Sequence, residues 1–323
     1  MSPATELLPA SGGGGLALEG APIAARTPRE LFWTRLKGDR VALASLAFIL
    51  FLVIVALAAP VIVKILGLPG PYVQNLNLTD EFGSPQGPSA AHPFGVDQLG
   101  QDVMSRVIYG TRTALQVGII GTTIATVIGV SFGLAAGFLR GWVDTLLSRT
   151  VDVVLSIPVL LLGLGIGAAC GVRGCIGGAV QPGVGVIIFL ILLVSWTYIY
   201  RIVRGLVLSL REREFVEASR ALGASNTRIM FREIMPNLIA PVIVYATLLI
   251  PLNILLEASL SFLGVGVRPP TASWGQMIAA ATPIFNTAWW YMVFPGLALL
   301  LTVLAFNLLG DGLRDALNPR TAR

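Results

Sequence analysis

Long apolar runs without a charged residue alternate along this chain with shorter polar segments. A helix needs about 20 apolar residues to cross a bilayer, and several runs come close to that length or exceed it. They are residues 41–63, 114–139, 153–170, 183–200, 238–256 and 288–309. The pattern therefore predicts an all-α integral membrane protein with six transmembrane helices.

The two shortest runs, 153–170 and 183–200, could be described as one helical hairpin or as two spans. The segment between them, CGVRGCIGGAVQPG, is rich in Gly and contains Pro, which favours two separate crossings joined by a turn. The first run, 41–63, is too long to be the apolar core of a cleaved signal peptide. We expect it to remain as a membrane anchor.

Lys and Arg are unevenly shared between the two sides of the predicted bundle. Seventeen of the 22 fall in segments 1–40, 139–150, 201–233 and 311–323, and five fall in 64–113, 170–183 and 263–287. Because cytoplasmic loops carry the excess of basic residues, the first set is expected in the cytoplasm. The chain would then be a multi-pass protein of the plasma membrane with both termini cytoplasmic.

Composition excludes several classes of protein. Hydrophobic residues make up 55% of the chain and charged residues only 12%, whereas a soluble domain carries about 25% charge. The net charge of +5 is scattered between apolar runs, so no nucleic-acid surface is expected. One His and two Cys give no metal cluster, and the phosphate-binding pattern G-x-x-x-x-G-K-S/T does not occur. We therefore expect a non-catalytic chain that holds no cofactor and does not hydrolyse ATP by itself.

These patterns divide the chain into five parts. Residues 1–40 form a cytoplasmic tail, and its segment 26–40 is either a basic amphipathic helix at the membrane surface or an ordinary solvated helix. The parts that follow are the first transmembrane helix (41–66), an extracytoplasmic loop (67–113), a core with five transmembrane helices (114–310) and a cytoplasmic tail (311–323).

One densely charged insert, REREFVEASRALGASNTRIMFREIMPN, interrupts the apolar core. Its pattern predicts two short helices, with a bend at Gly223, a cap at Ser225 or Asn226 and a stop at Pro236. A rigid projection with mixed charge and a patch of small residues suits docking into a groove of another protein.

Most of the insert, EFVEASRALGASNTRIMFREIMPN, resembles the EAA motif of binding-protein-dependent ABC importer permeases, the cytoplasmic loop that inserts into the ATPase subunit. Glu217, Ala218 and Gly223 match the motif, Ser219 replaces its second Ala, and Glu233 stands at a usual Ile position. We call residues 211–236 the coupling loop. The resemblance assigns coupling to the ATPase to Glu217, Ala218, Ser219, Gly223, Ala224, Arg228 and Pro236.

Other stretches narrow the resemblance. HPFGVDQLGQDVMSRVIYGTRTAL, RIVRGLVLSLREREFVEA, ASLSFLGVGVRPPTASWGQM and GDGLRDALNPR resemble the second (C-type) permease subunit of dipeptide, oligopeptide and nickel importers. The similarity covers nearly all of residues 29–320. It implies a type I ABC importer permease of MetI-like architecture that works by alternating access.

The resemblance also implies partners. They are a paralogous permease subunit, two ATPase subunits or one fused pair, an extracytoplasmic substrate-binding protein and the lipid bilayer. ATP and Mg would belong to the ATPase subunits. The solute is expected to be a dipeptide or oligopeptide, with nickel or another small solute as alternatives. A secondary transporter outside the ABC class is a further alternative, although it would not need a cytoplasmic coupling loop.

Two segments of the predicted outer side, 92–112 and 264–286, are expected to form an ordered external gate, or only to cap the bundle. The aromatic residues Trp274, Trp289, Trp290 and Tyr291 are expected as anchors at the membrane interface. The candidate gate residues are His92, Asp97, Asp102, Arg106 and Trp274.

Cys170 and Cys175 lie on the predicted outer, oxidising side, where thiols pair. A disulfide between them is expected, and two free thiols at a helix end are the alternative.

A few residues inside the apolar runs stand out. Gly129, Gly133 and Gly137 recur at the four-residue spacing that lets helices approach closely in lipid. Asp152 stands at a membrane edge. Glu257 ends the fifth run, where it is either a functional intramembrane acid or a carboxylate that reaches the interface.

Overall fold

The computed structural model describes residues 28–80 and 83–317, and these residues form helices joined by loops, with three isolated bridges in place of a sheet. The expected tail 1–25 and residues 318–323 lie outside the described residues. The helices are α1 (Pro28–Gly38), α2 (Arg40–Ile65), α3 (Val103–Leu115), α4 (Thr122–Leu139), α5 (Gly141–Ser156), α6 (Val159–Cys170), α7 (Val184–Val194), α8 (Trp196–Leu210), α9 (Glu214–Ala221), α10 (Asn226–Arg228), α11 (Met235–Phe262), α12 (Trp274–Ala281) and α13 (Trp290–Leu317).

Several of these helices join into longer spans. The helices long and apolar enough to cross a membrane are Arg40–Ile65, Val103–Leu139, Val184–Leu210, Asn226–Phe262 and Trp290–Leu317. They number five among the described residues, and the bent pair α5 and α6 makes a sixth when it counts as one span. The prediction of an all-α membrane protein is confirmed.

The predicted span 153–170 is not one straight helix. α5 and α6 are bent by 82° at the break between them. Pro158 has no N–H to donate, and it drives the preceding residue out of the helical region; Ile157 accordingly has φ −94° and ψ 123°. α5 also starts before the predicted run 153–170, because its charged side chains have partners on α8. Arg204 lies 2.5 Å from Asp144, and Arg201 lies 3.0 Å from Asp152.

Two other spans begin well before the predicted positions. α3 begins at Val103, and Asp102 caps it by accepting a hydrogen bond from the Ser105 amide at 2.7 Å. α10 and α11 join through a π-helical turn, Ile229–Ile234, into one helix of 37 residues. The prediction that Pro236 stops this helix is wrong. Pro236 falls in the first turn of α11, directly after the wider π turn, where a missing N–H is tolerated.

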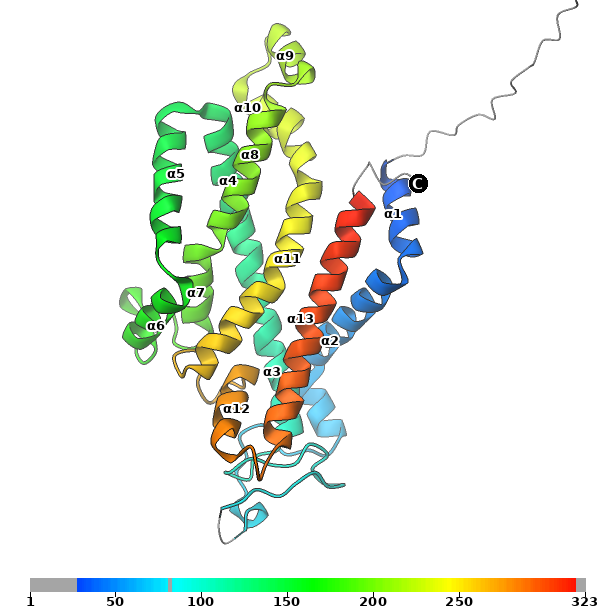
Figure 1. The fold of residues 1–323 in the computed structure, drawn as a ribbon, viewed down its shortest axis with the longest axis vertical. Coiled ribbons are helices and arrows are strands. Elements are labelled where there is room, and N and C mark those ends of the chain that lie inside the picture. The colour runs from blue at the N-terminus through cyan, green and yellow to red at the C-terminus, as the bar shows by residue number, and fades with distance from the viewer. Residues whose placement is uncertain (1–27, 81–82, 318–323) are drawn as a thin grey trace, which may run out of the picture.

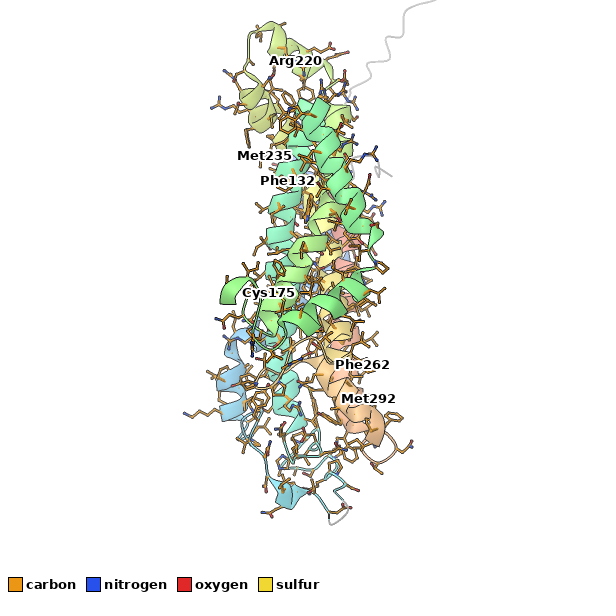
Figure 2. All side chains as sticks on the ribbon, turned by 90° about the vertical axis from the view of Figure 1, so that its left-hand side faces the viewer. Phe132, Cys175, Arg220, Met235, Phe262 and Met292 are labelled. Atoms are coloured by element: carbon orange, nitrogen blue, oxygen red, sulfur yellow. A yellow bond between two sulfur atoms is a disulfide. The ribbon has the colours of Figure 1, made fainter. Side chains whose placement is uncertain are left out.

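Figure 1 shows the helices as an elongated bundle. α1, α9 and the C-terminal end of α13 lie toward one end, which we call the α9 end. The loop that follows α2, together with α12, lies at the opposite end, which we call the α12 end. Figure 2 shows the same polarity, with Arg220 of α9 and Met292 of α13 near opposite ends of the molecule.

Glycines bring α4 and α8 into close contact. A Cβ atom added to Gly129, Gly133 or Gly137 would lie within 2.7 to 2.8 Å of Ile199, Val203 or Val207 on α8. No side chain larger than hydrogen fits there, so the predicted use of these glycines for helix packing is confirmed.

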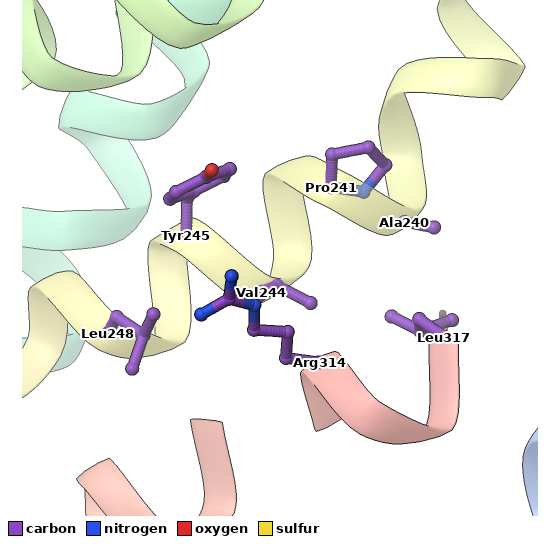
Figure 3. A pocket seen from close by; sticks show the side chains of 7 residues that line it. All are labelled: Ala240, Pro241, Val244, Tyr245, Leu248, Arg314 and Leu317. Atoms are coloured by element: carbon purple, nitrogen blue, oxygen red, sulfur yellow. The ribbon is translucent and has the colours of Figure 1, made fainter. Parts of the chain in front are cut away.

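α11 and α13 also touch through a glycine, because a Cβ atom at Gly310 would meet Leu248 at 2.7 Å. Beyond this contact, toward the α9 end, the two helices leave a cleft of about 230 Å³. Figure 3 shows Arg314 of α13 lying between the helices, near Tyr245 of α11, with apolar side chains around it.

Candidate functional site

The coupling loop projects from the α9 end of the bundle (Figure 1). α9 ends at Ala221, and Gly223 follows with φ +80°, a conformation that costs glycine little. The Ala224 amide donates to the Ser219 carbonyl at 3.0 Å, which closes the turn. The hydroxyl of Ser225 accepts from the Arg228 amide and starts α10. The expected bend at Gly223 and the cap at Ser225 are present.

The base of the coupling loop is fixed to the bundle. Val216 and Ile229 are fully buried in one cluster with Val207 of α8. The Arg211 guanidinium donates to the Phe138 carbonyl at 2.7 Å, and the Arg140 guanidinium donates to Glu212 at 2.8 Å. A force applied to α9 would therefore reach α4 and α8 through packed contacts.

The tip of the coupling loop is exposed and partly apolar. Leu222 is 89% exposed, and Phe231 is 54% exposed. The residues with an expected coupling role are spread over this surface: Glu217, Ala218, Gly223, Arg228 and Pro236 are exposed, and Ser219 and Ala224 are half-buried. Pro236 does not lie at the tip, since the adjacent Met235 sits further down the bundle than Arg220 in Figure 2.

Leu222 is the residue that the sequence pattern did not single out. Among the apolar residues of the insert, Val216 and Ile229 are fully buried, whereas Leu222 is exposed. Its spacing was the available signal, because six residues at about 3.6 per turn separate Leu222 from Val216, the residue that α9 buries, and this places Leu222 away from the buried face.

At the α12 end, four of the five expected gate residues form two side-chain pairs. Asp97 and Arg106 form an ion pair in which both side chains are about 5 to 6% exposed. Arg106 also donates to the Tyr291 hydroxyl at 3.0 Å. The His92 Nδ1 atom lies 2.8 Å from the carboxylate of Asp102, which is completely buried.

One indole group joins the two expected gate segments, and a second joins the segment 92–112 to α13. Trp274 donates to the Val107 carbonyl at 3.0 Å, and Trp290 donates to the Val96 carbonyl at 3.1 Å. Gly110 leaves room for the Trp274 ring, because a Cβ atom at position 110 would lie 2.7 Å from that ring. Segments far apart in the sequence are thereby packed together.

The prediction that four aromatic residues are membrane-interface anchors is wrong for three of them. Trp274, Trp290 and Tyr291 are 2%, 8% and 2% exposed, and only Trp289, at 48%, presents its ring to the surroundings. The reason is that buried indole and phenol groups have found partners inside the protein.

Glu257 is 1% exposed, so it does not reach the interface. Its Oε1 atom accepts from Ser261 at 2.8 Å and from Ser273 at 2.7 Å. The Ser261 hydroxyl in turn accepts from the Val267 amide at 3.0 Å. This carboxylate therefore fixes the loop between α11 and α12 to the end of α11. Asp152, in contrast, pairs with Arg201 at an exposed position.

The loop after α6 is closed by a disulfide between Cys170 and Cys175, whose Cα atoms lie 5.1 Å apart. No group of three or more His, Cys, Asp or Glu residues that could hold a metal occurs within 28–80 or 83–317.

Comparison with known proteins decides the family. Residues 129–323 match the family described as binding-protein-dependent transport system inner membrane component. This chain belongs to that family of permeases. Residues 27–87 also match the N-terminal transmembrane domain of oligopeptide transport permease C. The permease is therefore a non-catalytic membrane component, and the resemblance inferred from the motifs is confirmed.

Several curated relatives align over most of the permease. The dipeptide transport system permease protein DppC of Alkalihalophilus pseudofirmus is 39% identical over 292 residues, which are 90% of each chain. The glutathione transport system permease protein GsiD of Pectobacterium atrosepticum is 39% identical over 295 residues, 91% of this chain and 92% of the relative. A di/tripeptide transport system permease protein DppC of Pseudomonas aeruginosa is 39% identical over 298 residues, 91% of this chain and 93% of the relative.

A solved structure supports the fold. A chain of the inward-facing MetNI methionine ABC transporter matches with a TM-score of 0.55 and 21% sequence identity, and the match covers 67% of this chain and 98% of that one. At this identity the likeness speaks for the fold alone, and it agrees with the MetI-like architecture expected from the motifs.

Proposed function

We propose that this permease is one of two membrane subunits of an ATP-driven importer for dipeptides or short oligopeptides. The observation that carries the proposal is the structure of the coupling loop. Val216 and Ile229 fix its base to the bundle, and its tip exposes Leu222. A surface of that kind suits insertion into a partner. The names of the curated relatives support a peptide solute. Nickel or another small solute is the alternative.

The charge distribution supports one orientation of the permease in the membrane. The segments rich in Lys and Arg include α1, the coupling loop and the end of α13, and these three lie toward the same end of the bundle (Figure 1). Since basic residues favour the cytoplasmic side, this α9 end would face the cytoplasm. The α12 end, with the buried ion pair of Asp97 and Arg106, would face the extracytoplasmic binding protein.

Coupling would then run from the ATPase through the coupling loop into the bundle. Leu222 would fill a pocket of the ATPase subunit, and Glu217 and Arg228 would make polar contacts around it. Closure of the two ATPase subunits on ATP would move α9, and the contacts of Val216 and Arg211 would pass this movement to α8 and α4. The paralogous subunit would complete the solute pathway.

The test is reconstitution with the products of the neighbouring genes. The permease, its paralogue and the ATPase subunits are expected to co-purify from membranes. In nanodiscs, the binding protein loaded with a dipeptide is expected to stimulate ATP hydrolysis. Failure of the ATPase subunits to co-purify would refute the importer assignment. Stimulation with nickel and none with peptides would refute the peptide solute only.

A further inference from the structure

The cleft between α11 and α13 has no role in the description so far. It is lined by Ala240, Pro241, Val244, Tyr245 and Leu248 of α11 and by Arg314 and Leu317 of α13. Its volume of about 230 Å³ falls short of the ~300 to 1,000 Å³ of pockets that enclose a whole small molecule. The cleft therefore has room for part of a ligand whose remainder lies outside.

The depth of the cleft in the membrane restricts the ligand. Its α11 residues belong to the apolar run 238–256, so they lie at the level of the lipid chains. Arg314 lies five residues beyond the apolar run 288–309, which places it about 7.5 Å further along α13. The headgroup layer on each side of a bilayer is about 5 to 8 Å thick. The cleft thus extends from the headgroup layer into the hydrocarbon core.

Arg314 is the charged residue of the lining. Helical side chains lean toward the N-terminus of their helix, and Figure 3 accordingly shows Arg314 directed into the cleft. Arg314 has no ion-pair partner within residues 28–80 and 83–317. Asp311 and Asp315 are exposed on the same helix, but neither lines the cleft. Since Arg314 is itself exposed, a ligand can reach its guanidinium from outside.

The side chains around Arg314 define the chemistry of the ligand. A guanidinium binds a phosphate group through its planar fork of N–H donors. Tyr245 is 42% exposed, and its hydroxyl adds a donor that has no partner among the described residues. The other lining residues are apolar and suit a hydrocarbon chain. No carboxylate lines the cleft to pair with the ammonium group of a zwitterionic headgroup. The lining therefore favours a phospholipid with net negative charge.

Other occupants fit the cleft less well. A transmembrane helix of the paralogous subunit is about 10 to 12 Å across, which is too wide for a cleft of about 230 Å³. A soluble phosphate compound would leave the apolar lining without a partner. Only a ligand with both an anionic head and an apolar chain uses all of the lining.

We propose that the cleft between α11 and α13 binds an anionic phospholipid of the cytoplasmic leaflet, with the phosphate on Arg314 and part of one acyl chain along Pro241, Val244 and Leu248. The inference rests on the orientation given under the proposed function, in which the α9 end faces the cytoplasm, and not on the identity of the solute. α11 continues the helix that begins in the coupling loop, so the lipid would touch the span that carries this loop.

The experiment photo-crosslinks a phosphatidylglycerol with a diazirine in its acyl chain to the complete importer in phosphatidylcholine nanodiscs. Mass spectrometry measures the adducts on residues 240–248 and 310–317. Arg314→Gln should lower their yield about fivefold, the factor that corresponds to one basic residue at an anionic membrane surface. Arg314→Lys keeps the charge and should stay within twofold of wild type. Equal yields for wild type and Arg314→Gln would overturn the lipid site.

Arg149→Gln is the matched control for the loss of a positive charge. Arg149 is exposed on α5, it belongs to the basic segment 139–150 that is expected on the same side of the membrane, and it does not line the cleft. Its replacement should leave the yield within twofold of wild type. A fivefold loss in Arg149→Gln as well would show that general surface charge, and not the cleft, recruits the lipid, and would refute the site.

A second measurement uses the wild-type chain and so does not depend on the folding of a variant. Unlabelled phosphatidylglycerol should compete for the cleft at least fivefold better than phosphatidylcholine with the same acyl chains. Soluble glycerol phosphate should not compete. Competition by glycerol phosphate would identify a soluble anion as the ligand, and equal competition by the two lipids would remove the preference for negative charge. Adducts on the paralogous subunit with none on the cleft would show that this subunit covers it. Each of these three results would refute the proposal.

The outcomes separate this inference from the proposed function. If the importer assembles and hydrolyses ATP, but Arg314→Gln is labelled like wild type, only the lipid site is refuted. If the ATPase subunits do not co-purify with the wild-type permease, the importer assignment fails, and the adducts on the membrane-inserted permease still decide whether the cleft binds the lipid.

Discussion

The two ends of the permease use opposite arrangements of polar and apolar groups. At the α9 end, apolar side chains stand outside, with Leu222 89% exposed at the tip of the coupling loop. At the α12 end, charged side chains lie inside, with those of Asp97, Asp102 and Arg106 at most 6% exposed. An exposed leucine gains free energy when a partner covers it. A buried ion pair holds a local structure in place before any partner arrives. Under the proposed function, the first end is completed by another protein, whereas the second is already ordered by its own contacts.

The largest effect is expected from breaking the buried ion pair. Arg106→Met leaves Asp97 as an uncompensated buried charge, which should destabilise the protein by about 3 to 5 kcal/mol. Thermal unfolding of the purified importer should shift to clearly lower temperature. Arg140→Met breaks an exposed pair with Glu212, for which about 0 to 1 kcal/mol is expected, and serves as the control. Adding Asp97→Asn to Arg106→Met should recover part of the loss. Equal unfolding temperatures for Arg106→Met and Arg140→Met would contradict the comparison.

The exposed leucine should give the next largest effect, on assembly instead of folding. Leu222→Ala removes an apolar anchor, and truncation of a central anchor costs about 2 kcal/mol or more of binding free energy. ATPase subunits should co-purify at least tenfold less tightly, with normal amounts of permease in the membrane. Leu139→Ala is the control, since Leu139 is 53% exposed at the end of α4. Undiminished ATPase binding by Leu222→Ala would show that the tip is not an anchor.

The sequence predicted the apolar spans of the fold better than it predicted the polar starts of the helices. Apolar runs predicted the spans, because lipid requires long uncharged helices. The starts of α3 and α5 were missed because both helices begin among polar residues. Asp102 caps the first turn of α3, and Asp144 of α5 pairs with Arg204 of α8. These partners lie on other segments or depend on exact geometry, and a sequence pattern does not show them.

Functional residues that are adjacent in the sequence were predicted, whereas those brought together only by the fold were not. The EAA-like motif identified the coupling loop, since its residues are adjacent in the sequence. The cleft between α11 and α13 joins Tyr245 and Arg314 from distant segments, and only the fold brings them together. The aromatic residues at the α12 end were assigned to the lipid interface because a sequence does not show whether the N–H of a Trp faces water or donates to a buried carbonyl.

A smaller effect is expected from the disulfide in the loop after α6. In the chain-entropy model, closing a loop as short as 170–175 contributes about 2 kcal/mol. Cys170→Ser together with Cys175→Ser should lower the unfolding temperature by a few degrees and leave ATPase binding at the α9 end unchanged. Thiol titration of the denatured, unreduced wild-type protein should detect no free thiol. Two reactive thiols would show that the pair is not formed in the membrane.

The smallest effect should come from the backbone of the coupling loop. Gly223 has φ +80°, and a Cβ atom there would meet nothing within 4 Å, so any effect of a side chain is conformational. Gly223→Val should cost about 1 to 2 kcal/mol, because a β-branched residue is strained in this region. The tip would shift, and stimulation of ATP hydrolysis by the binding protein should fall severalfold while the permease stays in the membrane. Gly223→Asn is the control, since Asn tolerates positive φ, and it should keep most of the stimulation. If Val and Asn behave alike, the loss reflects the added side chain at the ATPase surface, and the role of the bend in setting the position of Leu222 is refuted.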